Sequence, residues 1–172
     1  MKLLIPLALV AFSFTASAAI DSTQLPPVKA LQQHNASLLS AGLPQAAEIP
    51  QLIAAGVDVV IDLIPVANGL ENEAQLVHQA DKNYYQIEVD WNNPTKANFE
   101  QFRQIMKQHN AADVLVHCQA NYRASAFVYL YQLTEHGEDD LTIMAPWGDL
   151  QQSLAKYPQW QELIDSVKAD IN

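Results

Sequence analysis

Short apolar runs alternate with amphipathic stretches along the chain. Four runs predict strands, because each is brief, apolar or β-branched and bounded by polar or turn residues: 37–40, 57–64, 84–89 and 113–116. The other stretches predict helices: 46–55, 70–81, one opened by 93–95, 123–135, and two in the tail, the last over 158–169. Strands joined by helices form right-handed crossovers in parallel sheets. We therefore expect an α/β domain of three layers, a mostly parallel sheet of four to five strands with helices on both faces.

The first 18 residues are expected to be a secretory signal peptide rather than part of this domain. Lys2 places a positive charge near the N-terminus, an apolar run follows to about Phe14, and the small residues 16–18 resemble a cleavage site. The apolar run is shorter than the about 20 residues that span a bilayer. We expect one mature domain, residues 19–172, without a membrane span and exported to the periplasm or secreted.

Composition restricts the partners and cofactors of this domain. The chain is 49% hydrophobic, enough for an ordinary core, and its formal net charge is −10. Nucleic acids and anionic membranes bind basic surfaces, so neither is an expected partner. No metal or other cofactor is expected, because the histidines outside the cysteine motif lack a second ligand at metal-binding spacing. An anion site in such a chain must be local, made by backbone N–H groups and one or two cations.

The chain has a single cysteine, Cys118. In an oxidising compartment it has no partner within the chain, so it is either buried and inert or kept for its reactivity. It lies between a predicted strand and a predicted helix, at the edge where open α/β sheets bind ligands. A helix N-terminus there binds oxyanions and favours a thiolate. Arg123, one of two arginines, can offer its planar guanidinium to the same anion.

The segment VHCQANYRAS, residues 116–125, resembles the phosphate-binding loop of cysteine-dependent phosphatases. More closely, it is similar to the beta-lactamase hydrolase-like, phosphatase-like proteins, which are relatives of the dual-specificity phosphatases. The resemblance extends to SLLSAGLPQAAEIPQLIAAGVDVVIDLI and YYQIEVDWNNPTKANFEQF, and it covers about residues 35–135. It implies the phosphatase-like α/β fold.

The resemblance also implies phosphoryl transfer from a phosphate-bearing small molecule or phosphoprotein. Cys118 would attack phosphorus and form a phosphocysteine that water hydrolyses. Arg123 and the loop amides would hold the phosphate oxygens. The expected phosphate-binding residues of the loop are Gln119, Ala120, Asn121, Tyr122, Arg123 and Ser125. Asn121 in addition tolerates a left-handed backbone better than most residues.

Four side chains receive individual roles from the same resemblance. Asp90, at the end of a predicted strand, is the expected general acid for the leaving oxygen. Asp62 is a weaker candidate, because it falls inside a predicted strand. Ser125 stands where phosphatases keep a hydroxyl that assists breakdown of the phosphocysteine. His117 is expected to orient the loop and tune the thiol.

The spacing within the loop leaves the reaction open. Four residues separate Cys118 from Arg123, whereas the usual phosphatase loop has five. Four is also the spacing of rhodanese-like sulfurtransferases, whose loop holds a persulfide. Three functions therefore remain: a phosphatase, a rhodanese-like sulfurtransferase or persulfide carrier, and a phosphate-binding or interaction domain with little turnover.

Export predicts a defined start for the mature chain. We expect the protein recovered from the periplasm or medium to begin at Ala19, or within one residue of it, because the small residues 16–18 direct cleavage there. Intact-mass analysis with N-terminal sequencing measures this directly. A chain that is recovered only from the cytoplasm and still carries Lys2 would contradict the prediction.

Overall fold

Five short strands form one sheet in the computed structural model, which describes residues 19–171. The expected signal peptide, residues 1–18, lies outside the described residues. The strand order is β1-β2-β5-β3-β4, with β1 antiparallel to β2 and all other pairs parallel. The strands are β1 (Gln32–Asn35), β2 (Leu38–Ala41), β3 (Val59–Asp62), β4 (Asn83–Gln86) and β5 (Val114–His117). The predicted mostly parallel sheet is confirmed.

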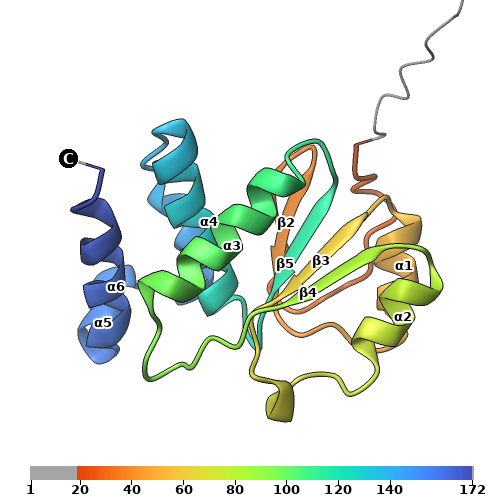
Figure 1. Cartoon of the computed structure of the whole chain (residues 1–172), viewed down its shortest axis with the longest axis horizontal. Coiled ribbons are helices and arrows are strands. Elements are labelled where there is room, and N and C mark those ends of the chain that lie inside the picture. The colour runs from red at the N-terminus through yellow and green to blue at the C-terminus, as the bar shows by residue number, and fades with distance from the viewer. Residues whose placement is uncertain (1–18, 172) are drawn as a thin grey trace, which may run out of the picture.

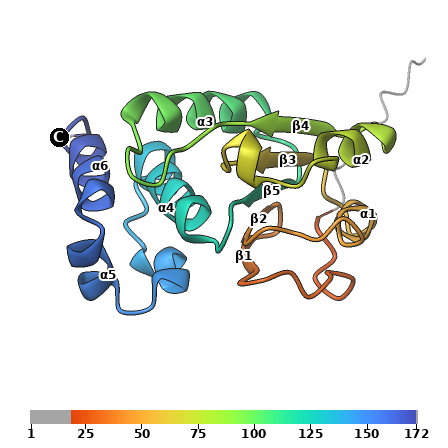
Figure 2. The same ribbon diagram turned by 90° about the horizontal axis from the view of Figure 1, so that it is seen from below.

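Helices cover both faces of this sheet (Figures 1 and 2), which confirms the predicted three layers. One face carries α1 and α2, and the other carries α3 and α4, with α5 and α6 beyond them. The helices are α1 (Ile49–Ala54), α2 (Glu73–Gln79), α3 (Lys96–Gln108), α4 (Tyr122–Tyr131), α5 (Leu150–Lys156) and α6 (Pro158–Lys168). Short 3-10 segments, η1 (Val66–Asn68) and η3 (Leu141–Trp147), and one π-helical turn, η2 (Gln132–His136), complete the order.

The central strands are mostly apolar because both of their faces are buried. Successive residues of a strand point to opposite faces, so β3 sends Val60 to one side and Ile61 to the other. On the side of α1 and α2, Val60 joins a small core with Leu52 and Val77. On the other side, Ile61 joins a larger core that includes three aromatic residues from α3, α4 and α6: Phe102, Phe127 and Trp160.

The hydrophobic pattern does not predict β1. Its residues, QQHN, are polar, and their burial alternates between half-buried and exposed. An edge strand of this kind is stabilised by backbone pairing with its neighbour and carries no apolar run. The short strand predicted over 37–40 corresponds to β2, the strand with which β1 pairs.

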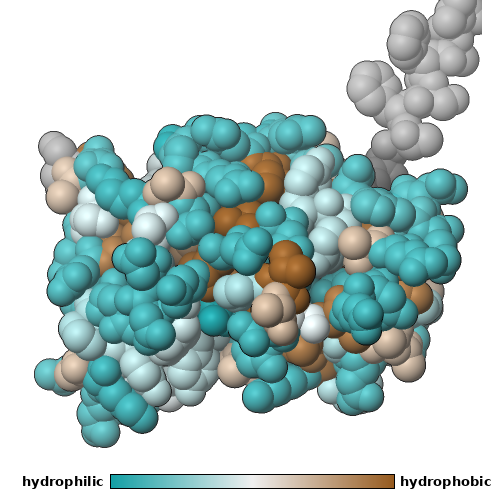
Figure 3. All heavy atoms as spheres, turned by 60° about the horizontal axis from the view of Figure 1, so that its bottom comes forward, coloured by the Kyte–Doolittle hydropathy of each residue, from teal (hydrophilic) through white to brown (hydrophobic). Residues whose placement is uncertain are grey.

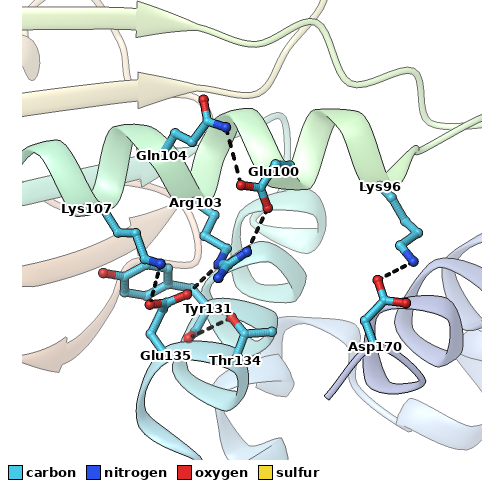
Figure 4. Close-up of polar contacts among 9 residues, drawn as sticks. All are labelled: Lys96, Glu100, Arg103, Gln104, Lys107, Tyr131, Thr134, Glu135 and Asp170. Carbon is cyan, nitrogen blue, oxygen red and sulfur yellow. Dashed lines mark hydrogen bonds and ion pairs between the residues drawn. The ribbon is translucent and has the colours of Figure 1, made fainter. Parts of the chain in front are cut away.

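Ion pairs hold the outer side of α3 to η2 and to the segment that follows α6 (Figure 4). Arg103 and Lys107 both reach the carboxylate of Glu135, the latter with an Nζ–Oε2 distance of 2.9 Å. Lys96 pairs with Asp170 near the end of the described chain. The cationic side chains are between a third and a half exposed, so solvent weakens these pairs and each contributes little to stability.

The face shown in Figure 3 is largely hydrophilic, with apolar side chains in a band across its middle. The largest exposed apolar side chains, Val66, Leu141 and Ile171, belong to separate segments of the described chain. Among residues 19–171, no helix has the length and apolar character needed to cross a membrane.

Candidate active site

Cys118 lies where the chain leaves β5 and turns toward α4 (Figure 1). The last residue of β5, His117, is paired with Ala41 of β2 on one side and with Asp62 of β3 on the other. The backbone N–H of Cys118 donates to the carbonyl of Ala41 at 3.2 Å, which extends the pairing by one residue. The loop therefore emerges at the carboxyl edge of the sheet, and α4 begins at Tyr122, one residue earlier than the pattern predicts.

A hollow of about 210 Å³ opens beside this loop. Cys118 is only 1% exposed and contributes to its wall, together with Arg123. The other lining residues are Trp91, Gln119, Ala120 and Tyr122. The structure thus brings the cysteine, the arginine and three of the predicted loop residues around one space, and it adds Trp91 from a different segment.

Asn121 anchors the loop rather than lining the hollow. Its backbone is left-handed, with φ 62° and ψ 14°, directly before the first residue of α4. Its buried side-chain amide donates to the carbonyl of Ala30 at 2.7 Å and to the hydroxyl of Ser40 at 2.9 Å. The side chain therefore ties the loop to β2 and to the segment before β1.

Gly42 allows the chain to pass closely behind the loop. It forms an isolated bridge with Ala120, and its N–H donates to the carbonyl of Lys29 at 2.7 Å. A β-carbon at this position would lie 3.0 Å from the carbonyl oxygen of Lys29 and 3.3 Å from that of Gln119. Only glycine fits there without displacing backbone on both sides.

The hydroxyl of Ser125 is occupied by the backbone of its own helix. It donates to the carbonyl of Asn121 at 2.5 Å, with a second, longer contact of 3.2 Å to that of Tyr122. The indole N–H of Trp147 also donates to the Tyr122 carbonyl, at 3.0 Å. Ser125 is fully buried and does not line the hollow, so in this structure its hydroxyl holds the first turn of α4 together.

Arg123 lies against an aromatic wall. Its guanidinium carbon is 5.6 Å from the ring centroid of Trp91, a cation–π geometry. Trp91 is held by Tyr157 and Trp160, at centroid distances of 4.9 and 5.2 Å, and its carbonyl accepts from the Trp160 indole at 3.1 Å. The Nε atom of Arg123 is buried without a hydrogen-bond partner among the described residues, so this donor is not used by the protein itself.

Asp90, the predicted general acid, is not among the residues around the hollow. It is exposed, and its Oδ1 accepts the backbone N–H of Asn92 at 2.9 Å in a local turn. Its neighbour Trp91 lines the hollow instead. In this structure the lining residues therefore include a thiol and a guanidinium but no carboxylate.

His117 is enclosed with two carboxyl groups behind the loop. Its Nε2 is 2.9 Å from an oxygen of Glu73, and its Nδ1 is 3.8 Å from an oxygen of Asp62. Burial alone would lower the pKa of His117, but the contact with Glu73 and the charges of Glu73 and Asp62 outweigh it and raise the pKa above 6.5. Burial also raises the pKa of Asp62, against the opposing effect of His117.

Glu73 is the member of this group that the sequence analysis missed. It lies in the first turn of α2, four residues before Val77, and both side chains are buried. The i, i+4 spacing places the two on one face of the helix, so the buried position is visible in the pattern. Nothing in the pattern shows that an acidic residue faces His117.

The three residues offer ligand atoms within 4.8 Å of one another, close enough for a metal ion. Both oxygens of Asp62 already accept hydrogen bonds, from the Ile64 N–H at 2.8 Å and the Tyr84 hydroxyl at 3.0 Å. Each ring nitrogen of His117 also faces a carboxylate. The arrangement suits a protonated imidazole between two acids better than a metal centre.

Comparisons with known proteins place this arrangement among phosphatase folds. No protein-family model and no curated protein matches the chain. A crystal structure of a DUF442 protein from Shewanella putrefaciens, described as a candidate phosphatase, is 47% identical, with a TM-score of 0.79. The match covers 84% of this chain and 92% of that one.

More distant structures share the fold. PTPMT1 in complex with PI(5)P is 18% identical over 83% of this chain and 99% of its own, with a TM-score of 0.62. Pseudomonas aeruginosa TpbA in complex with pTyr is 15% identical over 92% and 98% of the two chains, with a TM-score of 0.60. These structures support the predicted phosphatase-like architecture.

The anchor at Asn121 predicts a graded loss of stability. Asn121→Ala is expected to lower the free energy of unfolding by about 2 kcal/mol, because it removes two buried hydrogen bonds and leaves alanine in a left-handed conformation. Asn121→Gly loses the same hydrogen bonds but adopts this backbone without strain, so it should be about 1 kcal/mol more stable than the alanine variant. Urea denaturation measures both, and an alanine variant as stable as the glycine variant would refute the strain argument.

Proposed function

The chain belongs to the DUF442 family of candidate phosphatases, and on that premise we propose that it hydrolyses phosphate monoesters with Cys118 as the nucleophile. The observation that carries the proposal is the shared hollow, in which Cys118 and Arg123 line one space at the start of α4. The N–H groups of a helix start have no partners within the helix and bind oxyanions. A thiol, a cation and a helix N-terminus thus converge where a phosphate would lie.

The reaction proceeds in two displacements. The Cys118 thiolate attacks phosphorus, the bond to the leaving oxygen breaks, and a phosphocysteine forms. Water then attacks the same phosphorus, the sulfur–phosphorus bond breaks, and the thiolate and inorganic phosphate are released. Arg123 stabilises the non-bridging oxygens in both transition states by parallel N–H donors.

In this proposal Asp90 donates the proton to the leaving oxygen. In the present arrangement Asp90 lies outside the hollow, so the turn that follows it must bring the carboxyl group over the leaving oxygen. A leaving group that departs as a stable anion, such as p-nitrophenolate, needs no such proton.

The substrate is a small phosphomonoester or a phosphorylated side chain of a protein. Among the described residues, Arg123 is the cation that lines the hollow, beside the aromatic rings of Trp91 and Tyr122. PTPMT1 and TpbA have been crystallised with phosphate-bearing ligands, PI(5)P and pTyr, which supports this class of ligand. The formal net charge of −10 makes polyanions such as nucleic acids poor partners.

We also propose that the protein acts outside the cytoplasm, on the strength of residues 1–18. Within the superfamily, the three segments quoted above favour a position near the beta-lactamase hydrolase-like proteins. The single thiol then operates in an oxidising compartment without a second cysteine that could trap it as a disulfide within the chain.

The mature protein is expected to hydrolyse p-nitrophenyl phosphate with sensitivity to vanadate. Cys118→Ser should lower kcat by about 10³-fold or more, because the nucleophile is lost. Arg123→Lys should lower kcat/KM by about 10²-fold, since lysine keeps the charge but loses the planar fork. The matched control is Arg103→Lys, which changes the other arginine, on the outer side of α3, and should leave turnover unchanged.

Two results would overturn the phosphatase proposal. One is the absence of turnover from pH 5 to 8 in folded protein, and the other is full turnover in Cys118→Ser. Phosphate binding by calorimetry that is lost in Arg123→Ala, without any turnover, would identify a phosphate-binding domain instead.

A second function is favoured by the loop spacing and by the lining of the hollow. Four residues between Cys118 and Arg123 match rhodanese-like sulfurtransferases, and no carboxylate lines the hollow. Sulfur transfer needs no general acid: the thiolate attacks the outer sulfur of thiosulfate, the sulfur–sulfur bond breaks, and sulfite leaves. Cys118 then carries a persulfide, whose outer sulfur passes to an acceptor such as cyanide.

If this second function holds, incubation with thiosulfate should add the mass of one sulfur atom to Cys118. Cyanide should then remove it and form thiocyanate. Intact-mass spectrometry measures the first step and a colorimetric thiocyanate assay measures the second, with Cys118→Ser as the blank. An unmodified Cys118 after thiosulfate treatment would exclude the sulfurtransferase function.

A further inference from the structure

Three ionisable side chains from distant parts of the chain are buried together behind the nucleophile. Asp62 ends β3, His117 ends β5, and Glu73 lies in the first turn of α2. Their exposed fractions are 1%, 0% and 0%. Burying ionised groups is costly unless they are paired, so the contacts among the three must compensate.

His117 is the group that both acids share. Glu73 faces its Nε2 at 2.9 Å, and Asp62 faces its Nδ1 from the opposite side of the ring, at 3.8 Å. Asp62 also accepts from the Ile64 N–H and the Tyr84 hydroxyl, whereas among the described residues the carboxylate of Glu73 contacts His117 alone. A neutral imidazole carries one N–H, so only the doubly protonated ring directs an N–H toward each carboxylate, at contact distance for Glu73 and as a longer electrostatic attraction for Asp62.

Among residues 19–171, Glu73 and Asp62 are the charged groups that affect His117. β2 places Ala41 opposite it, and β4 contributes Tyr84, whose hydroxyl contacts Asp62. The pKa of His117 is therefore governed by burial, which lowers it, and by Glu73 and Asp62, which raise it above 6.5. Without the charge of Glu73, only the carboxylate of Asp62, 3.8 Å from Nδ1, would oppose the effect of burial on the pKa of His117.

The buried ring is also fixed in place relative to the nucleophile. His117 directly precedes Cys118, and its carbonyl accepts from the Leu63 N–H at 2.9 Å. Successive strand residues point to opposite faces, so α2 holds the His117 side chain from one side while Cys118 faces the other core. A cation held one residue from a thiol favours the thiolate form.

We propose that Glu73, together with Asp62, is a positioning residue for the nucleophile: it holds His117 as an imidazolium in a single orientation and thereby favours the Cys118 thiolate. The inference rests on the proposed use of Cys118 as a nucleophile. It does not depend on the substrate, because a phosphatase and a sulfurtransferase both need the thiolate. Glu73 acts through His117 and does not touch the substrate.

The rate of Cys118 alkylation by iodoacetamide, measured against pH, tests the inference without any substrate. In Glu73→Gln the ring loses its charged partner, becomes neutral near pH 7, and no longer favours the thiolate. The pH midpoint of alkylation should therefore rise by about one unit, a roughly tenfold slower reaction below the midpoint. The control, Glu71→Gln, removes the same charge from an exposed position two residues away and should leave the midpoint unchanged.

Nitrogen-15 NMR of the unmodified protein tests the same inference without relying on any variant to fold. The His117 ring should give imidazolium resonances at pH 7, assigned by through-bond correlation to its own backbone. A neutral His117 ring at pH 7, a metal ion bound in stoichiometric amount, or an unchanged midpoint in a folded Glu73→Gln would overturn the inference. Absent turnover with the expected alkylation profiles would count against the proposed function alone.

Discussion

The parallel pairing of β5 between β2 and β3 is the constraint on which the candidate site depends. Because all three strands run in the same direction, their carboxyl ends meet at one edge of the sheet, and His117 is aligned with Ala41 and Asp62. The next residue, Cys118, must leave the sheet at that edge. Helices cover both faces of the sheet, so its interior is largely apolar. The thiol lies at the boundary between this core and the hollow.

The two faces of the sheet contribute different interactions at this edge. On the side of α3, α4 and α6, aromatic side chains hold Trp91 and give Arg123 a flat surface to lie on. On the side of α2, Glu73 reaches His117, and buried charges replace aromatic packing. Since Arg123 and His117 contact different layers, the proposed roles of the two residues can be altered separately, one through the aromatic layer and the other through α2.

Much of the fold could be predicted because the buried strands are apolar runs and the helices between them are amphipathic. The motif around Cys118 also predicts the cysteine and Arg123 at one edge, and the structure brings both to the hollow. The polar strand β1 escaped prediction because backbone pairing, which has no apolar signature, holds it. Glu73 escaped because its partner is distant in sequence, and the exposed position of Asp90 depends on how one turn is directed.

The hydrogen bond from the side-chain amide of Asn121 to the carbonyl of Ala30 joins residues 91 positions apart in the sequence. Contacts of such separation form only after the intervening chain is ordered, since closing a long loop costs entropy before the contact compensates for it. The geometry of the Cys118 loop is thus a property of nearly the whole domain. A fragment that begins after β1 would retain the motif and its helix but not the contact that sets the loop.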